Sequence, residues 1–333
     1  MRASVIGSGS FGTALANVLA VNCERVGLWG RDAALAEAIN THHENASYLA
    51  GIALSPRIQA TTSLKEALEG AEVVVLAAPS HATREVMAQA RPFLPHHVPL
   101  ITVAKGIENE TLLTMTELLE DCLPEEFHPY IAVLSGPSFA KELAQRMPTV
   151  VTIASHWDRV ALRCQKALRT ETFRSYTSTD VVGVQYGGAL KNVIAIAAGI
   201  ADGLGMGHNA RAGIITRGLA EITRLAVRKG GNPLTLSGLS GMGDLVLTCT
   251  GELSRNRHVG IELGRGRSLQ EILGDMKQVA EGVKTARSAR DLARKVGVEL
   301  PICEQVYAIA YEDKSARAAV VELMTRQPKS ELI

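Results

Sequence analysis

The sequence predicts an α/β protein in two parts, an N-terminal doubly wound sheet and a C-terminal domain made only of helices. In the first half of the chain, short β-branched runs alternate with helical stretches, which is typical of a parallel sheet with helices on both faces. From Val184 onward such runs almost disappear, and helical stretches follow one another. A chain of 333 residues is long enough for two cores. We therefore expect a sheet domain over residues 1–184 and a helical domain over residues 185–333.

The first predicted elements surround a glycine-rich turn. Residues 1–6 read as a short buried strand, and residues 13–21 read as an apolar helix; between them lies Gly7-Ser8-Gly9-Ser10-Phe11-Gly12. In this context Gly7 permits the tight turn, Gly9 lets the backbone approach a pyrophosphate, and Gly12 lets the helix pack closely on the strand. The start of the helix also attracts phosphate charge. The sequence therefore predicts a Rossmann-type dinucleotide site rather than a glycine-rich turn without a ligand.

The second strand, expected at residues 25–29, bears on which dinucleotide is bound. NAD-selective sites usually end this strand with an Asp or Glu that accepts a hydrogen bond from the ribose 2′-hydroxyl. Here Gly30 and Arg31 follow the strand, and Asp32 comes one position later. Because a guanidinium group can pair with a 2′-phosphate, Arg31 favours NADP(H), or use of both cofactors. The alternative is that Arg31 is a solvated loop charge and that Asp32 reads the ribose.

Four further strands complete the predicted sheet. They are expected at residues 72–77, 100–104, 131–134 and 149–154. Ligands of doubly wound sheets bind outside the carboxyl ends of the strands. Three of these ends carry candidate loops: Ala78-Pro79-Ser80, Lys105-Gly106 and Ser135-Gly136-Pro137-Ser138. Lys105 and Ser138 are therefore candidate site residues, although Lys105 could instead be a solvated turn residue.

Seven helices are expected in the second half of the chain. They cover residues 185–200, 212–229, 254–263, 268–274, 283–296, 301–311 and 316–325. We see no long linker before the first of them, so we expect that helix to leave the sheet and enter the helical domain directly.

Three positions in this half carry candidate chemistry. Lys191 lies among small and apolar residues, and burial lowers the pKa of a lysine toward that of a usable acid or base; alternatively its ammonium group snorkels out to solvent. Asp244, in a glycine-rich segment, could charge-balance a lysine or be an ordinary helix N-cap. Ser254-Arg255-Asn256 places donors at a helix start, which suits a phosphate, or is a plain cap with an exposed arginine.

Composition excludes several kinds of partner. The net charge is +1 and the aromatic content is 4%, which disfavours nucleic acid and anionic membranes. The longest apolar run, near residues 193–200, is too short to span a bilayer. The five cysteines include no C-x-x-C pair, which favours a reduced, cytoplasmic protein. His42-His43 and His96-His97 have no third ligand at a suitable spacing, so we expect surface histidines and no metal.

Seven segments, taken together and in order, resemble the bacterial soluble NAD(P)-dependent glycerol-3-phosphate dehydrogenase family. They are Gly7-Ser8-Gly9-Ser10-Phe11-Gly12-Thr13-Ala14, Ala104-Lys105-Gly106, Leu134-Ser135-Gly136-Pro137-Ser138-Phe139-Ala140, Gly188-Ala189-Leu190-Lys191-Asn192, Gly241-Met242-Gly243-Asp244-Leu245 with Thr248, Ser254-Arg255-Asn256, and Val279-Ala280-Glu281-Gly282. The segment around Lys191 is far more specific than the glycine turn. The family pairs an N-terminal Rossmann domain with a helical domain, as expected above from the residues.

The resemblance implies the reversible reduction of dihydroxyacetone phosphate to sn-glycerol 3-phosphate, which would supply the glycerol phosphate of phospholipids. In the family, the lysine matching Lys191 donates or accepts the proton at the carbinol oxygen. The resemblance assigns the remaining substrate contacts to Lys105, Gly136, Ser138, Asn192, Asp244, Thr248, Ser254, Arg255 and Asn256. It assigns the contacts to NADP(H) or NAD(H), with NADP(H) favoured, to Gly7, Gly9, Ser10, Phe11, Gly12, Arg31, Lys105, Ala140, Arg255, Val279 and Glu281.

Two other functions compete with this one. A two-domain dehydrogenase of the 3-hydroxyacid or 6-phosphogluconate type would also combine a Rossmann domain, a helical domain and a lysine, but the Asp244 loop and residues 254–256 argue against it. A dinucleotide sensor without turnover would need neither Lys191 nor Asp244. Apolar faces in the helical domain are compatible with a homodimer.

Overall fold

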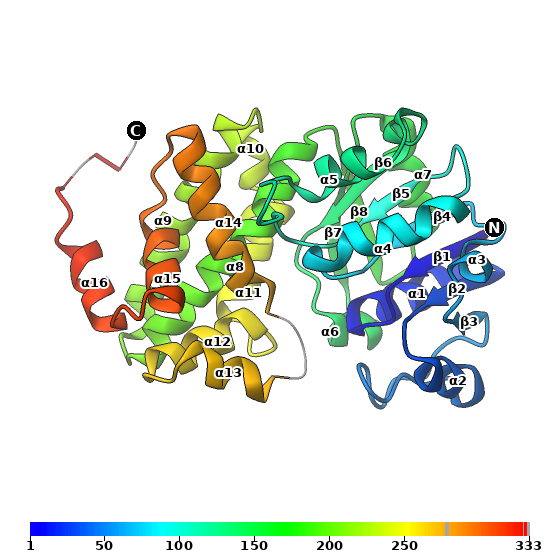
Figure 1. Cartoon of the computed structure of the whole chain (residues 1–333), viewed down its shortest axis with the longest axis horizontal. Helices are drawn as coiled ribbons and strands as arrows, with labels where there is room; N and C mark the ends of the chain where they lie inside the picture. The colour runs from blue at the N-terminus through cyan, green and yellow to red at the C-terminus, as the bar shows by residue number, and fades with distance from the viewer. Residues whose placement is uncertain (277–279, 329, 332–333) are drawn as a thin grey trace.

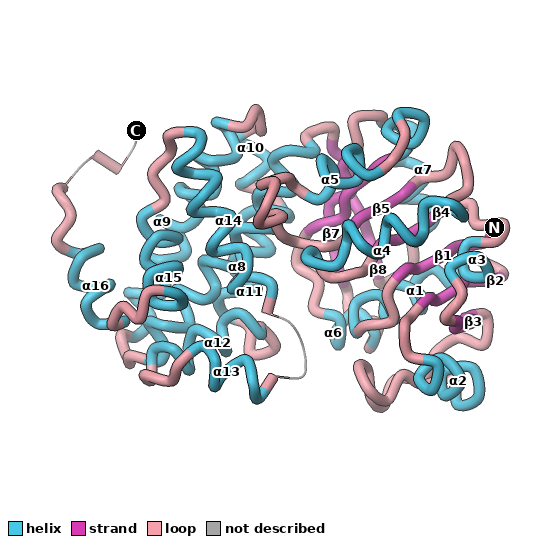
Figure 2. The backbone as a smooth tube through the Cα atoms, viewed as in Figure 1, coloured by secondary structure: helices cyan, strands magenta, loops and turns pink. Residues whose placement is uncertain are grey.

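The computed structural model describes residues 1–276, 280–328 and 330–331. A sheet domain with the N-terminus lies beside a helical domain with the C-terminus (Figure 1). The described strands all lie in the sheet domain, and the described residues from α8 (Val181–Gly203) onward are helical or irregular (Figure 2). The predicted fold class is therefore confirmed. The predicted boundary between residues 184 and 185 falls inside α8, and the division at that residue stays a prediction.

The sheet has eight strands in the order β3-β2-β1-β4-β5-β6-β7-β8. Their bounds are β1 (Arg2–Ile6), β2 (Arg25–Trp29), β3 (Ile58–Thr61), β4 (Val73–Leu76), β5 (Leu100–Thr102), β6 (Ile131–Ser135), β7 (Thr149–Ala154) and β8 (Phe173–Ser178). Side chains alternate between the two faces: Val73 and Val75 belong to one core, and Val74 and Leu76 belong to another. The sheet therefore has a buried core on each face.

The expectation of a parallel sheet is wrong at one edge. β7 pairs with β6 in antiparallel fashion, and β8 is parallel to β7, so the last two strands run opposite to the other six. The connection from β6 to β7 contains only the short helix α6 (Ala140–Ala144), which packs against α1 (Ser10–Asn22) instead of crossing the sheet. A parallel pair would need a crossover connection along the sheet.

Helices cover both faces of the sheet. The core that contains Val73 also includes residues of α1, α2 (Ala33–His42), α6 and α7 (Asp158–Leu168). The opposite core includes residues of α3 (Leu64–Leu68), α4 (Thr83–Ala90) and α5 (Met115–Cys122). This is the double winding that the alternation of strand and helix patterns predicts.

The helical domain is built around α8. Its other helices are α9 (Gly207–Arg228), α10 (Pro233–Leu236), α11 (Asp244–Thr250), α12 (Arg255–Gly264), α13 (Leu269–Asp275), α14 (Glu281–Val296), α15 (Pro301–Tyr311) and α16 (Ala316–Met324). Among the described residues, α8 is the one helix long and apolar enough to cross a membrane by length and composition. It is almost entirely buried inside the protein, as the core helix of such a domain is.

Glycines let α12 lie directly against α8. A Cβ added to Gly199 of α8 would come within 2.1 Å of the Arg257 carbonyl oxygen, and one added to Gly260 of α12 would come within 2.1 Å of the Ile196 oxygen. Because real Cβ atoms do not approach so closely, a larger residue at either position would separate the helices. This close crossing fixes the start of α12, with Arg255 and Asn256, relative to the middle of α8.

Candidate functional site

Two lysines and one aspartate form a compact charged cluster where the domains meet. Lys105 follows β5 in the sheet domain, Lys191 lies in the middle of α8, and Asp244 begins α11. Asp244 Oδ1 accepts a hydrogen bond from Lys191 Nζ at 2.7 Å, and Oδ2 accepts one from Lys105 Nζ at 2.6 Å. One carboxylate therefore balances two ammonium groups that come from different domains.

The glycine-rich segment before α11 presents Asp244 to α8. A π-helical turn, Leu239–Gly243, precedes α11, and a Cβ at Gly241 would lie 2.0 Å from the Leu236 carbonyl oxygen. The facing glycine of α8 is Gly187, where a Cβ would lie 2.5 Å from the Ser240 oxygen. Asp244 itself is not an N-cap, since Gly243 holds that position. The alternative of an ordinary capping aspartate is therefore wrong.

Lys191 stays inside the protein. It is 6% exposed, so the alternative of a lysine that snorkels to solvent is wrong. Besides Asp244, its ammonium group donates to Thr248 Oγ1 at 2.7 Å, and the Thr248 hydroxyl donates to the Asp244 carbonyl oxygen at 2.6 Å. An ammonium group has three N–H donors, and within the described residues only two have acceptors. One donor is left for a ligand.

Burial and neighbouring charges together set the pKa values of Lys191 and Asp244. Burial lowers the pKa of Lys191 to about 8, with Lys105 acting in the same direction and Asp244 opposing both. Burial alone would raise the pKa of Asp244, but the charges of Lys105 and Lys191 hold that pKa below its ordinary value. Asp244 is therefore ionised near neutral pH, while Lys191 can both lose and regain a proton there.

Gly188 brings Lys105 close to α8. A Cβ at Gly188 would lie 2.5 Å from Ser135 Oγ and 3.5 Å from Lys105 Cγ. The Lys105 ammonium group also donates to the Gly136 carbonyl oxygen at 3.0 Å, and that oxygen accepts a second bond from Ser138 Oγ at 2.9 Å. The loop after β6 thus fixes the direction of Lys105. The structure brings together Lys105, Gly136 and Ser138, as their shared place at the strand ends predicts.

A chain of amide hydrogen bonds runs behind the lysines. Asn192 Nδ2 donates to the Lys105 carbonyl oxygen at 3.3 Å, and Asn192 Oδ1 accepts from Asn256 Nδ2 at 2.9 Å. Asn256 Oδ1 in turn accepts from the Gly282 backbone N–H at 2.9 Å. Both asparagine side chains are therefore held in one orientation, and one N–H of each amide group remains for a ligand.

Arg255 lies in the first turn of α12, next to this chain. Ser254 caps the helix by accepting from the Arg257 N–H at 3.2 Å, as expected of a serine cap. The Arg255 side chain reaches solvent, but protein crowds its guanidinium group enough that desolvation lowers its pKa, with Glu281 opposing the shift. No described residue accepts a hydrogen bond from this group. A free guanidinium at a helix start suits an anion.

The glycine turn is closely packed on one side and open on the other. Gly7 has a φ of +125°, and a Cβ there would lie 2.8 Å from the Ala77 carbonyl group; one at Gly12 would lie 1.9 Å from the Gly7 oxygen. A Cβ at Gly9 would meet nothing within 4 Å, so this face of the turn is open. The first turn of α1 lies directly behind it, with no side-chain cap. This open, glycine-lined helix start fits a pyrophosphate.

Two other expected cofactor residues belong to the turn itself, and a third lies on a helix that contacts α1. Ser10 Oγ donates to the Tyr48 carbonyl oxygen at 2.8 Å, and Phe11 packs against the sheet core. Ala140 begins α6, which contacts α1. Val279 lies outside the described residues.

Arg31 and Asp32 differ in their availability. Both side chains are exposed, but the Asp32 carboxylate caps α2 by accepting from the Leu35 N–H at 3.1 Å. Among the described residues, Arg31 has no hydrogen-bond or ion-pair partner. Arg31 is therefore the freer of the two groups to contact a ligand at the end of β2.

One contact between the domains had no signal in the sequence. Glu281 Oε1 accepts a hydrogen bond from the Ser80 backbone N–H at 2.9 Å, across 201 positions of the chain. This bond joins the start of α14 to the loop that follows β4. Ser80 and Glu281 each lie in a segment singled out above, but their pairing depends on how the domains meet and is not visible in either segment.

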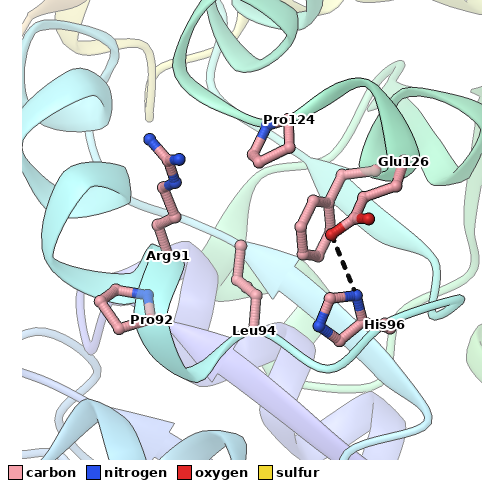
Figure 3. Close-up of a pocket in the computed structure, with 7 residues that line it drawn as sticks. Arg91, Pro92, Leu94, His96, Pro124 and Glu126 are labelled. Carbon is pink, nitrogen blue, oxygen red and sulfur yellow. Dashed lines mark ion pairs between the residues drawn. The ribbon is translucent and has the colours of Figure 1, made fainter.

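A separate hollow of about 460 Å³ lies at the opposite end of the strands (Figure 3). Its lining includes Leu94, which precedes β5, and Phe127, which precedes β6. His96 forms a 3.3 Å ion pair with Glu126 there, shown as a dashed line in Figure 3. The hollow contains none of the charged groups described above, so it is distinct from the candidate site.

The chain matches two family models that together cover most of its length. The first is described as NAD-dependent glycerol-3-phosphate dehydrogenase N-terminus and matches residues 2–161. The second is the C-terminus of the same family and matches residues 180–321. Among curated proteins, the chain is similar to glycerol-3-phosphate dehydrogenase (NAD(P)+) of Myxococcus xanthus, with 82% identity over 332 residues, 100% of this chain and 99% of the relative. The enzyme of the same name from Leptospira biflexa is 50% identical and is covered to 99%.

Solved structures show the same similarity. A crystal structure of glycerol-3-phosphate dehydrogenase from Coxiella burnetii has a TM-score of 0.91 and 37% identity, covering 98% of this chain and 99% of that one. The corresponding yeast structure has a TM-score of 0.82 and 28% identity, covering 96% and 98%. A D-mandelate dehydrogenase with NADH has a TM-score of 0.64 at 12% identity, which shows the fold alone.

Proposed function

Since this chain belongs to the NAD-dependent glycerol-3-phosphate dehydrogenase family, we propose that Lys191 moves the proton in its reaction and that Asp244 positions Lys191. The chain is an NAD(P)-dependent glycerol-3-phosphate dehydrogenase, which interconverts dihydroxyacetone phosphate and sn-glycerol 3-phosphate. The observation that carries the proposal is the buried carboxylate of Asp244, which bonds Lys191 at 2.7 Å and Lys105 at 2.6 Å.

A nicotinamide dinucleotide supplies or accepts the hydride when it is bound. The open face of the turn at Gly9 and the start of α1 behind it would hold the pyrophosphate. Loops that carry Lys105 and Gly136 follow neighbouring strands at the same edge of the sheet, so the substrate would lie between this edge and α8. The sheet domain would bind the pyrophosphate of the cofactor, and Lys191 of the helical domain would transfer the proton.

Lys191 has the geometry and the charge of a general acid. When a hydride adds to a ketone carbon, negative charge develops on the carbonyl oxygen, and a fixed cation stabilises it. Lys191 would donate its third N–H to that oxygen, since Asp244 and Thr248 take the other two. Its pKa of about 8 leaves it mostly protonated at pH 7 but able to release the proton. In the reverse direction, the neutral amine would take the proton from the hydroxyl group.

Lys105 adds a second cation near the reacting end. It is bonded to Asp244 and to the Gly136 carbonyl oxygen, so its position is fixed before substrate binds. Its third N–H would contact a substrate oxygen while Lys191 transfers the proton. The charge of Lys105 also helps to lower the pKa of Lys191.

The substrate phosphate would bind at the start of α12. Arg255 presents a guanidinium group without a described partner, and Ser254 and Asn256 are its neighbours in the sequence. The remaining N–H of the Asn256 amide group can reach an oxygen of a bound anion. Helix N-termini favour phosphate, and a guanidinium group binds it through paired N–H donors.

The wider setting follows from the same reaction. The product would supply the glycerol phosphate of phospholipids, and all five cysteines are free, which favours reaction in the cytoplasm. A homodimer stays a prediction. If the reaction supplies phospholipids, a strain without this gene should need added glycerol 3-phosphate for growth.

The pH dependence of kcat/KM in both directions tests the role of Lys191. Ketone reduction needs protonated Lys191, so its kcat/KM should fall as the pH rises through about 8. Alcohol oxidation needs the neutral amine, so its kcat/KM should rise through the same value. Lys191→Arg should show neither the fall nor the rise of kcat/KM near pH 8. Lys295→Arg, at an exposed position of α14, should show both. If the pH dependence of kcat/KM is unchanged in Lys191→Arg, another group is responsible for the titration.

A further inference from the structure

Three basic side chains converge beside the glycine turn. Arg31 follows β2 and His81 follows β4, and these strands lie on either side of β1. A Cβ at Gly30 would lie 2.1 Å from Ser8 Oγ, while Gly7 touches the Ala77 backbone on the other side. The loops that carry Arg31 and His81 therefore flank the turn from both sides.

The third side chain comes from the helical domain. Glu281 accepts from the Ser80 N–H, which holds the first turn of α14 over the loop that carries His81. The start of α14 lies on the side of its domain that faces the sheet (Figure 1). Lys284 is three residues after Glu281, and residues three apart share one face of a helix. Lys284 is therefore directed toward the same loop.

The pKa of His81 is shifted by burial and by the charges around it. Burial lowers the pKa of His81, and the charges of Lys284 and Arg31 lower it further, while Glu281 acts in the opposite direction. The side chains of Arg31, His81 and Lys284 all reach solvent. Within residues 1–276, 280–328 and 330–331, none of the three has a hydrogen-bond or ion-pair partner. An unpartnered group of basic side chains at a dinucleotide site calls for an anion.

We propose that His81 and Lys284 join Arg31 in binding the 2′-phosphate of NADP(H), so that this cofactor bridges the two domains. The inference rests on the proposed cofactor site, since the end of β2 is where the adenosine ribose lies. A phosphate monoester carries close to two negative charges at pH 7, which the Arg31 guanidinium and the Lys284 ammonium would balance, while the uncharged His81 imidazole would donate an N–H. NADH has only a hydroxyl group there and gains nothing from Lys284.

Binding constants for both cofactors test this assignment. Dissociation constants of NADPH and NADH would be measured by fluorescence for the wild type, Lys284→Gln and His81→Gln. Lys295→Gln, an exposed lysine three turns further along α14, is the matched control. Lys284→Gln should weaken NADPH binding roughly five- to twentyfold and NADH binding less than twofold, with a smaller loss at high salt. The control should change neither.

Competition by two nucleotides distinguishes a contact to the 2′-phosphate from a contact to the rest of the cofactor. Adenosine 2′,5′-bisphosphate and 5′-AMP differ only by the 2′-phosphate, so Lys284→Gln should weaken inhibition by the first alone. Equal losses for both nucleotides, or no loss for either, would overturn the inference. If Arg31→Ala weakens NADPH binding more than NADH binding but Lys284→Gln does not, the inference fails while the role of Arg31 stands. If the wild type binds both cofactors equally, the NADP(H) preference itself fails.

Discussion

Lys191 Nζ and Asp244 Oδ1 lie 2.7 Å apart at a position where both side chains are shielded from solvent. Removing two charges from water is costly, and that cost is recovered only with good geometry and further hydrogen bonds. Thr248 and Lys105 supply those bonds. The cluster is therefore better explained by catalysis than by stability, because an apolar core would serve stability as well.

Asp244→Asn tests that explanation. The variant leaves the buried Lys191 ammonium and the partly buried Lys105 ammonium without their carboxylate, so it should lose about 3–5 kcal/mol of folding stability. The pKa of Lys191 should fall, so kcat/KM for ketone reduction should begin to fall at a lower pH. Thermal unfolding and the pH profile of kcat/KM measure these two effects.

Asp121→Asn is the matched control for this change. Asp121 pairs with Arg84 at 2.6 Å, but the pair is exposed, with 53% of the Asp121 side chain accessible. Such a pair contributes at most about 1 kcal/mol. A loss of stability in Asp244→Asn no larger than that of the control, with an unmoved pH profile, would contradict the role assigned to Asp244.

Arg255→Ala should raise KM for dihydroxyacetone phosphate. Loss of a charge-assisted hydrogen bond removes about 1.5–3 kcal/mol, which is a tenfold to hundredfold change. Turnover of unphosphorylated dihydroxyacetone, which is expected to be poor in the wild type, should change little. Steady-state kinetics with both ketones measures the difference. A variant that keeps the full wild-type preference for the phosphorylated ketone would place the phosphate elsewhere.

Arg31→Ala should lower NADPH affinity well beyond NADH affinity. A charge-assisted bond to the 2′-phosphate is lost, so a shift of tenfold or more is expected for NADPH. The loss should shrink at high salt because the group is exposed. KM values for both cofactors at two salt concentrations provide the measurement. Equal losses would mean that Arg31 does not recognise the 2′-phosphate.

The predictable part of the fold is the part with strong local patterns. β2 and β7 match their predicted bounds, since β7 is a β-branched run and β2 is mostly apolar, as buried strands are. β3 and β8 were not predicted, because both lie at the edges of the sheet and carry polar residues that weaken the hydrophobic signal. The reversed direction of β7 depends on where α6 packs, which no local pattern reports.

In the site, too, local sequence patterns were predictable and tertiary contacts were not. Lys191, Asp244 and Lys105 were each candidates with an ordinary alternative, because the sequence places Asp244 53 positions from Lys191 and 139 positions from Lys105. The close approaches at Gly187 and Gly188 bring them together, and these depend on tertiary packing. His81 and Lys284 had no signal at all, since each is a single exposed basic residue.

Glu221, which lies outside the candidate site, should make the stability of the protein depend on pH. It lies on α9 and accepts from the backbone N–H groups of Ile302 and Cys303 at the start of α15; burial raises its pKa to about 7. The folded state therefore holds a proton that the unfolded state releases near pH 4.5, so this contribution to stability is present at pH 5 and is lost as the pH rises toward 7.

Glu221→Gln removes this titration. The melting temperature of the wild type, relative to that of the variant, should fall between pH 5 and pH 7.5. Comparing the two proteins cancels the other titrating groups that they share. A constant difference between the two melting temperatures across that range would contradict the raised pKa.

The most direct test of the account is the turnover of Lys191→Ala, with Lys191→Met as a variant closer in volume. Both should fold and bind NADPH within about twofold of the wild type, because Lys191 lies on α8 and not at the glycine turn. Loss of the proton donor should lower kcat for ketone reduction by about 10²–10⁴-fold. A folded Lys191→Ala protein with kcat close to the wild-type value would contradict the assignment of Lys191 as the group that moves the proton.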